Sequence, residues 1–232
     1  MRKVIQMSGY GNRGKTPHER VSGNDSAPRD YHHGSLPQAL LEAAETVLQR
    51  DGLAGLSLRA IAREAGVSHT APQHHFGDMK GVLSELAALG NVRLVASMAD
   101  HAAAAPSRRT RQKAIGRGYV AFAVGNPDLF RLMGRHELLD AQRPSLMNAR
   151  RAAIRGLAGV FDFDQTEKDE IDEGTGMFGA VTAAQLVKMT GAWASVHGLA
   201  SLLIDNRLNG LIALSDEFRS AEDLVDAVFD QL

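Results

Sequence analysis

The stretch that most constrains the fold is residues 57–76, SLRAIAREAGVSHTAPQHHF, which predicts two short helices joined by a tight turn. Ser57 can cap the first helix, because its hydroxyl oxygen can accept a hydrogen bond from an N–H of the first turn. Gly66 stands where a left-handed residue often ends a helix, and Ser68 can cap the second helix. Phe76 closes the unit as an apolar anchor. Such a unit predicts a helix-turn-helix, whose second helix enters the DNA major groove.

Both flanks of this unit continue the helical pattern. Upstream, Ser35 can cap a helix that Gly52 ends, and downstream Asp78 can cap a long helix over residues 79–105. Further helices are expected over residues 108–124, 128–139, 144–161, 167–207 and 215–231, with glycines splitting the fourth of these. Aromatic residues are few, at 5%, and alanine and leucine are many, so we predict an all-α protein.

The order of these helices resembles the TetR (tetracycline-repressor-type) family of bacterial transcription regulators. The resemblance rests on YHHGSL at 31–36, ALLEAA at 39–44, GLSLRAIAREAGVS at 55–68 and the pattern AP–HHF–D at 71–78. It implies an N-terminal three-helix helix-turn-helix DNA-binding domain followed by a C-terminal helical effector and dimerisation domain. It also implies a homodimer that binds double-stranded DNA at a palindromic operator, represses transcription and responds to a small-molecule effector.

A second resemblance lies in the C-terminal half, where residues 193–198 read WASVHG. This segment is similar to the Trp-His-Gly type of ligand-binding domain found in one branch of the TetR family. Trp193 and His197 are four positions apart and therefore share one helix face. We accordingly expect three regions: a flexible basic tail over residues 1–29, a DNA-binding domain over 30–78, and a ligand-binding and dimerisation domain over 79–232.

The residues that would contact DNA follow from their positions in the helix-turn-helix. The first residues of a recognition helix reach base edges, and the flanks hold phosphates. We expect His69, Thr70 and Gln73 to read bases. The remaining expected contacts, to phosphates or at the helix start, are Ser57, Arg59, Ser68, His74, His75 and Lys80.

Three positions in or directly after the DNA-binding domain over 30–78, called the head from here on, depart from the family pattern. Gln73 stands where the resemblance implies a phosphate-binding tyrosine, and Ala71 stands where many members carry threonine. Met79 takes the place of a lysine after Asp78, so that Lys80 comes one residue late. One residue turns a side chain by about 100° around a helix, which changes where the lysine points.

An effector pocket is expected among the middle helices of the C-terminal half. Most pockets are apolar with a few polar groups, so its candidates are bulky apolar residues together with two histidines. They are Phe122, Phe130, Met133, His136, Met177, Phe178, Met189, Trp193 and His197. Small residues recur from Gly191 to Ser201, which favours close helix pairing across a dimer, and Ser220 with Asp223 predicts a capping box at the last helix.

One motif predicts a different class of protein. Residues 9–16, GYGNRGKT, fit the phosphate-binding pattern G-x-x-x-x-G-K-[ST]. A nucleotide-binding loop needs a helix directly after it, whereas the next residues, PHERVSGNDSAPRD, have the composition of a linker. We therefore favour a regulator over a nucleotide-dependent enzyme. A protein that binds DNA without reading its sequence is the other alternative.

Composition sets the remaining bounds. The chain has no cysteine, which excludes disulfides and thiolate metal sites, and the histidines show no zinc-binding spacing, so we expect no metal and no cofactor. We find no run of about eighteen apolar residues and no apolar leader, so neither a membrane span nor a secretory signal is expected. These features favour a cytoplasmic location. Residues 1–80 hold ten Lys/Arg against eight Asp/Glu, a small positive balance for a DNA-binding head.

Overall fold

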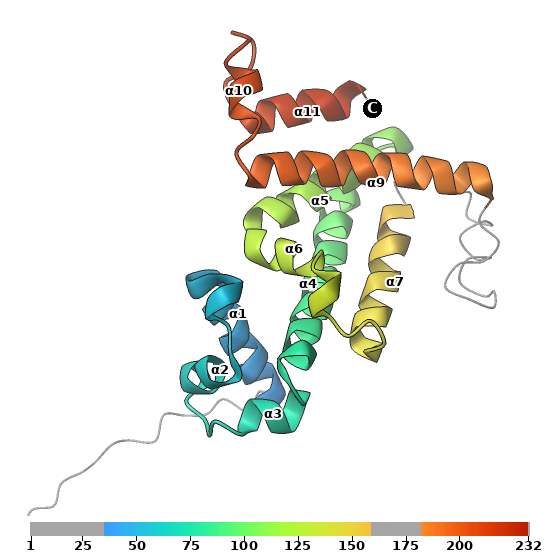
Figure 1. Cartoon of the computed structure of the whole chain (residues 1–232). Coiled ribbons are helices and arrows are strands. Elements are labelled where there is room, and N and C mark those ends of the chain that lie inside the picture. Colours follow the sequence, from blue (N-terminus) through green and yellow to red (C-terminus); the bar gives the residue numbers. More distant parts are fainter. Residues whose placement is uncertain (1–34, 159–181, 232) are drawn as a thin grey trace, which may run out of the picture. The chain divides into compact units, whose positions relative to one another are not determined.

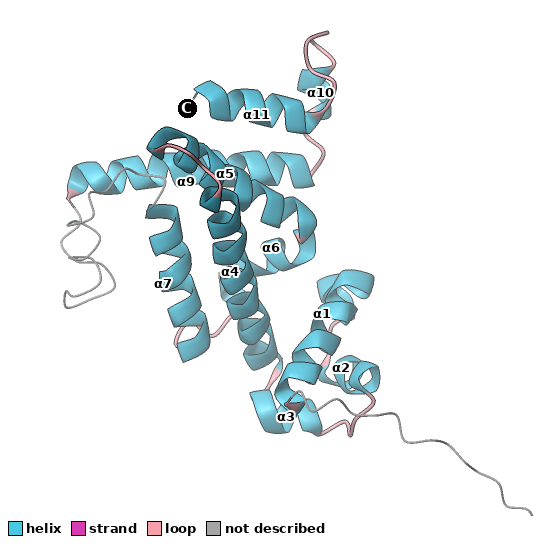
Figure 2. Cartoon of the chain, turned by 180° about the vertical axis from the view of Figure 1, so that it is seen from behind, coloured by secondary structure: helices cyan, strands magenta, loops and turns pink. Residues whose placement is uncertain are grey.

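The computed structural model describes residues 35–158 and 182–231 (Figure 1). Over these ranges the chain is helical and contains no strand, which confirms the all-α prediction (Figure 2). The N-terminal helices are α1 (Leu36–Gly55), α2 (Leu58–Ala65), α3 (Ala71–Phe76) and α4 (Met79–Ala103). They are followed by α5 (Arg108–Gly125), α6 (Pro127–Met133), the 3₁₀ turn η1 (His136–Leu138), α7 (Pro144–Ala158), α9 (Ala183–Ile204), α10 (Asn209–Ile212) and α11 (Ala221–Gln231).

The predicted tail over residues 1–29 and the phosphate-loop pattern at 9–16 lie outside the described residues. Met177, Phe178 and the first part of the helical stretch expected over 167–207 lie outside them as well.

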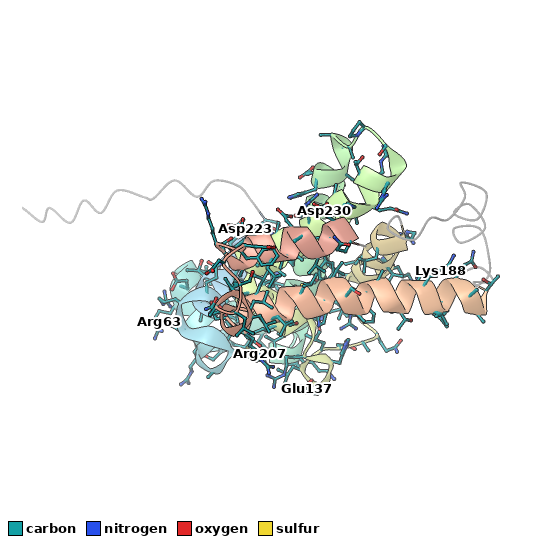
Figure 3. All side chains as sticks on the ribbon, turned by 90° about the horizontal axis from the view of Figure 1, so that it is seen from above. Arg63, Glu137, Lys188, Arg207, Asp223 and Asp230 are labelled. Atoms are coloured by element: carbon teal, nitrogen blue, oxygen red, sulfur yellow. The ribbon has the colours of Figure 1, made fainter. Side chains whose placement is uncertain are left out.

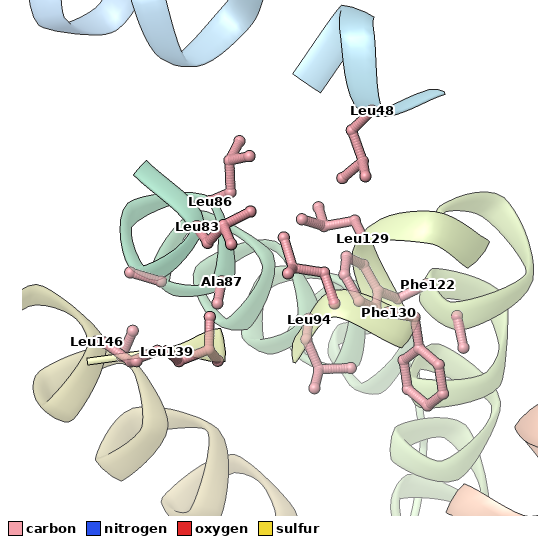
Figure 4. Close-up of a cluster of buried hydrophobic side chains, with 14 of the residues drawn as sticks. Leu48, Leu83, Leu86, Ala87, Leu94, Phe122, Leu129, Phe130, Leu139 and Leu146 are labelled. Atoms are coloured by element: carbon pink, nitrogen blue, oxygen red, sulfur yellow. The ribbon is translucent and has the colours of Figure 1, made fainter. Parts of the chain in front are cut away.

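Helix α4 is the centre of the fold. It packs against α1 and α3 of the head and against α5, α6 and α7 of the C-terminal half. Its side chains Leu83, Leu86 and Leu94 are buried in the same cluster as Leu129 of α6 and Leu146 of α7 (Figure 4). Burying a leucine side chain contributes roughly 1.5–3 kcal/mol, so this shared core holds the head and the C-terminal half together.

Helix α4 is also the one helix among the described residues that is long and apolar enough to cross a membrane. Its mean hydropathy reaches 1.3 over an 18-residue window. However, 56% of that window is buried inside the protein. An apolar helix that packs on several other helices is a normal core element, and its composition follows from that position.

The polar contacts of α4 tie two more segments to it. The Glu45 carboxylate of α1 accepts hydrogen bonds from both terminal nitrogens of Arg93, at 2.9 Å for Nη2 to Oε2. On the other side, Glu85 accepts from Arg143 Nε at 2.5 Å and from Ser145 Oγ at 2.9 Å. The α1 helix and the segment before α7 are thus both fastened to α4 by charged hydrogen bonds, which are stronger than neutral ones.

Helices α9 and α11 meet α5. The Phe229 ring lies over Gly116, where a Cβ atom would come within 2.5 Å of its Cε1. Ion pairs join α5 and α11, with Arg117 Nε 2.6 Å from Asp226 and Lys113 Nζ 3.0 Å from Asp230. Figure 3 shows α9 and α11 running alongside each other, with Asp223 and Asp230 near opposite ends of α11.

Several of the expected helices have different bounds in the structure. The first continues past Gly52, which has a non-helical conformation, to Gly55. The helix expected over 128–139 is split, because α6 ends at Met133 and η1 follows. The chain turns there so that Leu139 reaches the core at 3% exposure and the Asp140 N–H donates to Ser84 Oγ at 2.8 Å. The helix expected over 215–231 begins only at Ala221.

The predicted cap of that last helix is confirmed in part. The Asp223 N–H donates to Ser220 Oγ at 3.1 Å, as a capping serine requires. In the expected capping box, the Asp223 carboxylate would accept a hydrogen bond from the Ser220 N–H. It accepts instead from the Arg219 N–H, at 3.2 Å. At the first helix, Ser35 holds the N-cap position but its side chain makes no capping bond.

Candidate nucleic-acid interface and effector platform

The joint between α2 and α3 forms as predicted. Ser57 Oγ accepts a hydrogen bond from the Ala60 N–H at 3.1 Å, which satisfies one free donor of the first turn of α2. Gly66 ends α2 in the left-handed conformation, with φ of 67° and ψ of 31°. This conformation strains residues with a Cβ atom, so glycine fits here better than any other residue. The Val67 side chain that follows packs on the core.

The start of α3 differs from the prediction. The helix begins at Ala71 with Thr70 at the N-cap position, whereas Ser68 was expected to cap a helix beginning at residue 69. Ser68 Oγ instead lies 3.1 Å from Thr70 Oγ1, and its carbonyl accepts from the Ala71 N–H at 3.0 Å. The physical reason lies in Pro72, which has no N–H: it now lies in the first turn, where that group has no partner within the helix.

Helix α3 has one buried face and one exposed face. Pro72 and Phe76 are buried, and Phe76 anchors the helix to the core as expected. Gln73, His74 and His75 are exposed on the helix surface. All nine residues expected to contact DNA are exposed, namely Ser57, Arg59, Ser68, His69, Thr70, Gln73, His74, His75 and Lys80.

The joint between α3 and α4 explains the different surroundings of Met79 and Lys80. Asp78 Oδ1 accepts from the Gly81 N–H at 2.8 Å and so begins α4, as predicted. A Cβ atom on Gly81 would clash with the Phe76 carbonyl oxygen. Only glycine at position 81 therefore allows α3 and α4 to approach this closely. Met79 is half-buried at the edge of the core, whereas Lys80 is exposed.

The positive charges of the head are not all available to a partner. Arg50 is occupied by Asp51 and Glu64, and its hydrogen bonds to these carboxylates raise its pKa above the ordinary value. Arg59 and Lys80 form no ion pair with the described residues, and both are exposed. The exposed surface of the head thus carries positive charge that its own carboxylates do not neutralise.

In the C-terminal half, four aromatic side chains of α5, α6 and α9 form one cluster. The Tyr119 hydroxyl lies 3.0 Å from His197 Nδ1. The Phe130 ring is 5.2 Å from the His197 ring and 5.8 Å from the Tyr119 ring, measured between centroids. The Trp193 ring is 6.1 Å from His197. Three of these residues were expected at the effector site. Tyr119 was missed, because its contact with His197, 78 positions away, leaves no signal in the local sequence.

The other expected effector residues that the structure describes do not join this cluster. Phe122 is buried in the core, and Met133 packs against Gly90 of α4. His136 is exposed on η1, where its Nδ1 lies 3.0 Å from Arg150 Nη2. Met189 is half-buried on α9. Burial lowers the pKa of Arg150 and also that of His197 in the aromatic cluster.

Two cavities lie near α11, of about 280 and 260 Å³. The first is lined by residues of α9, α10 and the start of α11, and the second by residues of α4, α5, α9 and α11. Both include Leu203 and Glu222, and neither is lined by Trp193 or His197. The aromatic cluster therefore lines neither of these two cavities, and Trp193 is its half-exposed member.

Known protein families match both halves of the chain. A family model described as "Tetracyclin repressor-like, C-terminal domain" matches residues 113–228, which is half of the chain. A second model, described as "Bacterial regulatory proteins, tetR family", matches residues 40–86, which include α2, α3 and the start of α4. The chain belongs to the tetR family of bacterial regulatory proteins.

Two solved structures are similar to the chain over most of its length. A protein of unknown function from Rhodococcus sp. RHA1 is 33% identical, with a TM-score of 0.65, and the match covers 88% of this chain and 96% of that one. The TetR family transcriptional regulator PfmR from Thermus thermophilus is 18% identical, with a TM-score of 0.52 over 82% of this chain and 94% of that one. At that identity, the likeness to PfmR shows the fold alone.

A curated relative matches a shorter part of the chain. The uncharacterized HTH-type transcriptional regulator YobS of Bacillus subtilis strain 168 is 25% identical over 97 residues. The match covers 42% of this tetR-family chain and half the length of YobS.

Proposed function

We propose that this tetR-family chain is a DNA-binding transcription regulator that reads an operator through α3. The observation that carries the proposal is the division of α3 into two faces. Pro72 and Phe76 are buried, while Gln73, His74 and His75 are exposed and spread their hydrogen-bonding side chains around the rest of the helix. A short polar helix held by an apolar anchor is the arrangement that a recognition helix needs in the major groove.

The residues of the head divide into two proposed roles. Gln73, which lies in the middle of α3, presents an amide that can bond both the N6 and N7 of an adenine, and Thr70 offers a methyl group to thymine. His69 at the turn before α3 completes the base-reading set. Arg59 and Lys80, with His74 and His75, would hold phosphates, and Ser57 and Ser68 would donate their hydroxyl protons there.

The regulator would act as a homodimer through α9 and α11. Val187 of α9 is 72% exposed, so α9 carries apolar surface that has no partner within the described chain. Gly191 and Gly198 have open space at their Cα atoms, which permits a second helix to approach closely. A two-fold dimer would place two copies of α3 on two half-sites about one DNA turn apart.

A small-molecule effector would control this DNA binding from the C-terminal half. In one conformer of the dimer, the two recognition helices are wrongly spaced for the operator. The effector must bind this conformer more tightly than it binds the DNA-competent conformer. Helix α4 is the route, because Arg143 and Ser145 of the C-terminal half bond Glu85 in the first turns of α4, next to the head. A regulator of this kind works in the bacterial cytoplasm, where its operator is.

The test is binding to a fluorescent duplex that carries the promoter next to this chain's own gene, with random duplex as competitor. A sequence-reading regulator should prefer the promoter by about a thousandfold or more at fixed salt. Equal affinity for the two duplexes would overturn operator reading and leave a non-specific DNA-binding protein. Saturable ATP binding by the full chain would favour the nucleotide-dependent alternative of residues 9–16.

Dimerisation is tested separately by analytical ultracentrifugation. Val187→Glu should shift the chain from dimer to monomer, because the charge would be buried without a partner. The matched control is Val92→Glu on α4, where the valine is 55% exposed but lies on a different helix. If neither variant changes the sedimentation coefficient, α9 is not the dimer face.

A further inference from the structure

The aromatic cluster contains a hydrogen bond that sets the proton of a surface histidine. Tyr119 is 4% exposed, and burial raises its pKa, so its hydroxyl keeps its proton. Among the described residues, its hydrogen-bond partner is His197 Nδ1, 3.0 Å from the Tyr119 oxygen. A buried O–H that points at no acceptor costs free energy, so the Tyr119 hydroxyl donates its proton to Nδ1.

This direction determines which nitrogen of His197 carries hydrogen. Nδ1 accepts the Tyr119 proton, and burial of part of the ring lowers the pKa of His197, which favours the neutral form. A neutral imidazole with an accepting Nδ1 carries its hydrogen on Nε2. His197 is exposed, and Nε2 has no hydrogen-bond partner among the described residues. The cluster thus offers an unused donor at the surface of α9.

Beside this donor lies an aromatic ring that is only half covered. Trp193 is 52% exposed, although its indole is the largest apolar side chain of α9. Its ring and the His197 ring lie 6.1 Å apart between centroids, with planes inclined by 59°. Phe130 supports the His197 ring from behind at 5.2 Å and 34°. The two exposed rings form a platform, defined here as Trp193 and His197, on a rigid backing of Phe130 and Tyr119.

We propose that the Trp193–His197 platform binds a planar aromatic compound that carries a hydrogen-bond acceptor such as a carbonyl oxygen. The aromatic ring would stack on Trp193, and the acceptor would take the Nε2 hydrogen of His197. The inference rests on the proposed function, in that such a compound would be the effector, and it names the chemistry of that effector. Tyr119 is a positioning residue, since it acts only through His197.

A second copy of the chain is a poorer occupant of this platform. The small-residue stripe of Gly191 and Gly198, to which α9 of a second copy could pack, lies roughly a third of a turn around the helix from Trp193 and His197. Two apolar helix faces would also leave the His197 donor buried without an acceptor. A buried donor without a partner costs about 1–3 kcal/mol, so a ligand with an acceptor satisfies the site better.

The chain offers a clean test because Trp193 is its single tryptophan. Its indole N–H therefore gives one cross-peak in a ¹H–¹⁵N correlation spectrum of the full-length protein. The probe is acetophenone, which has an aromatic ring and a carbonyl acceptor. The controls are ethylbenzene, which lacks the acceptor, and cyclohexyl methyl ketone, which lacks the aromatic ring. Acetophenone should shift the indole peak saturably and bind about three- to tenfold more tightly than either control.

Two variants separate the hydrogen bond from the packing. His197→Phe keeps a ring against Phe130 but removes the donor, so acetophenone should lose its advantage over ethylbenzene. Tyr119→Phe should weaken acetophenone binding by a smaller factor. It should also change the ring ¹⁵N chemical shifts of His197 from those of one tautomer to those of a mixture of two tautomers. A merely structural role of Tyr119 would not produce this change. The matched control is His136→Phe, at the expected effector histidine that lies outside the cluster.

Each outcome decides the proposal. Equal binding of acetophenone and ethylbenzene, or unchanged binding by His197→Phe, would overturn it. An indole peak that moves with protein concentration and not with acetophenone would show that a second copy covers the platform, which also overturns it. The experiment contains no DNA, so its failure leaves the operator preference untouched. Loss of operator preference, in turn, would leave platform binding standing as a property of α9.

Discussion

Arg93 of α4 grips Glu45 of α1 through both carboxylate oxygens, across 48 positions of sequence. The Glu45 side chain is nearly buried, whereas that of Arg93 remains partly open to water. A buried carboxylate that loses its partner keeps its desolvation cost with nothing to offset it. The pair therefore affects stability mainly through the cost of breaking it. It fixes the first helix of the head on the central helix of the fold.

Arg93→Ala should therefore lower the free energy of unfolding by about 1–3 kcal/mol and weaken DNA binding in proportion to the misplaced head. Urea unfolding and duplex binding measure the two effects. Arg135→Ala is the control, since Arg135 and Glu137 pair at 2.5 Å on the surface. An exposed pair contributes at most about 1 kcal/mol. Equal losses in both variants would contradict the special position of Arg93.

Gly81→Ala should disturb the joint between α3 and α4. The new methyl group would collide with the Phe76 carbonyl, a backbone atom that cannot move without shifting α3. We expect a loss of about 1–3 kcal/mol in stability and a larger loss of operator binding than of stability. The comparison is Gly125→Ala, where a methyl group meets nothing within 4 Å. Unaltered operator binding by Gly81→Ala would show that α3 tolerates the shift.

The stability of the C-terminal half should depend on pH through His197. Burial lowers the pKa of His197 in the folded chain, so the unfolded chain binds more protons as the pH falls. Stability from this residue is complete above the ordinary histidine pKa of about 6.5 and is lost as pH falls from there through the lower folded value. The melting temperature of the wild type should fall more between pH 7.5 and pH 5 than that of His197→Phe. Parallel curves would refute this.

Deleting residues 1–29 should reduce the salt dependence of DNA binding. These residues carry six Lys/Arg, whereas the described head leaves few cations unpaired. Each lost phosphate contact should flatten the plot of log affinity against log salt by about 0.9. Anisotropy titrations between low and moderate salt measure the slope. A full-length variant with glutamine at the six positions serves as the control, and an unchanged slope would show that the tail makes no phosphate contact.

Substitutions on the exposed face of α3 should separate base reading from phosphate binding. Gln73→Ala should reduce the preference for the operator over random duplex by roughly 5- to 150-fold, the range of 1–3 kcal/mol for a bidentate base contact. Lys80→Ala should weaken both duplexes alike, because phosphates carry no sequence information. If Gln73→Ala weakens both duplexes equally, Gln73 holds a phosphate, as the tyrosine implied at its position would.

The sequence by itself determined the helices of the head, because their ends depend on bonds between close neighbours. Ser57 caps α2, Asp78 caps α4 and Gly66 turns the chain, each through contacts no more than four residues away. The same locality explains where the prediction was wrong. Ser68 indicated a helix that begins at residue 69, whereas α3 begins at Ala71, so that Pro72 lies in the first turn, where its missing N–H costs no helical hydrogen bond.

Only the tertiary structure decided which distant side chains meet. Tyr119 and His197 are 78 positions apart, and nothing in either local sequence indicates their hydrogen bond. It also decided that α6 ends at Met133, because Leu139 and the Asp140 N–H have their partners on α4. Helical spacing fixes the face on which a residue lies. The partner on that face depends on how α4, α5 and α9 pack, which the whole core determines at once.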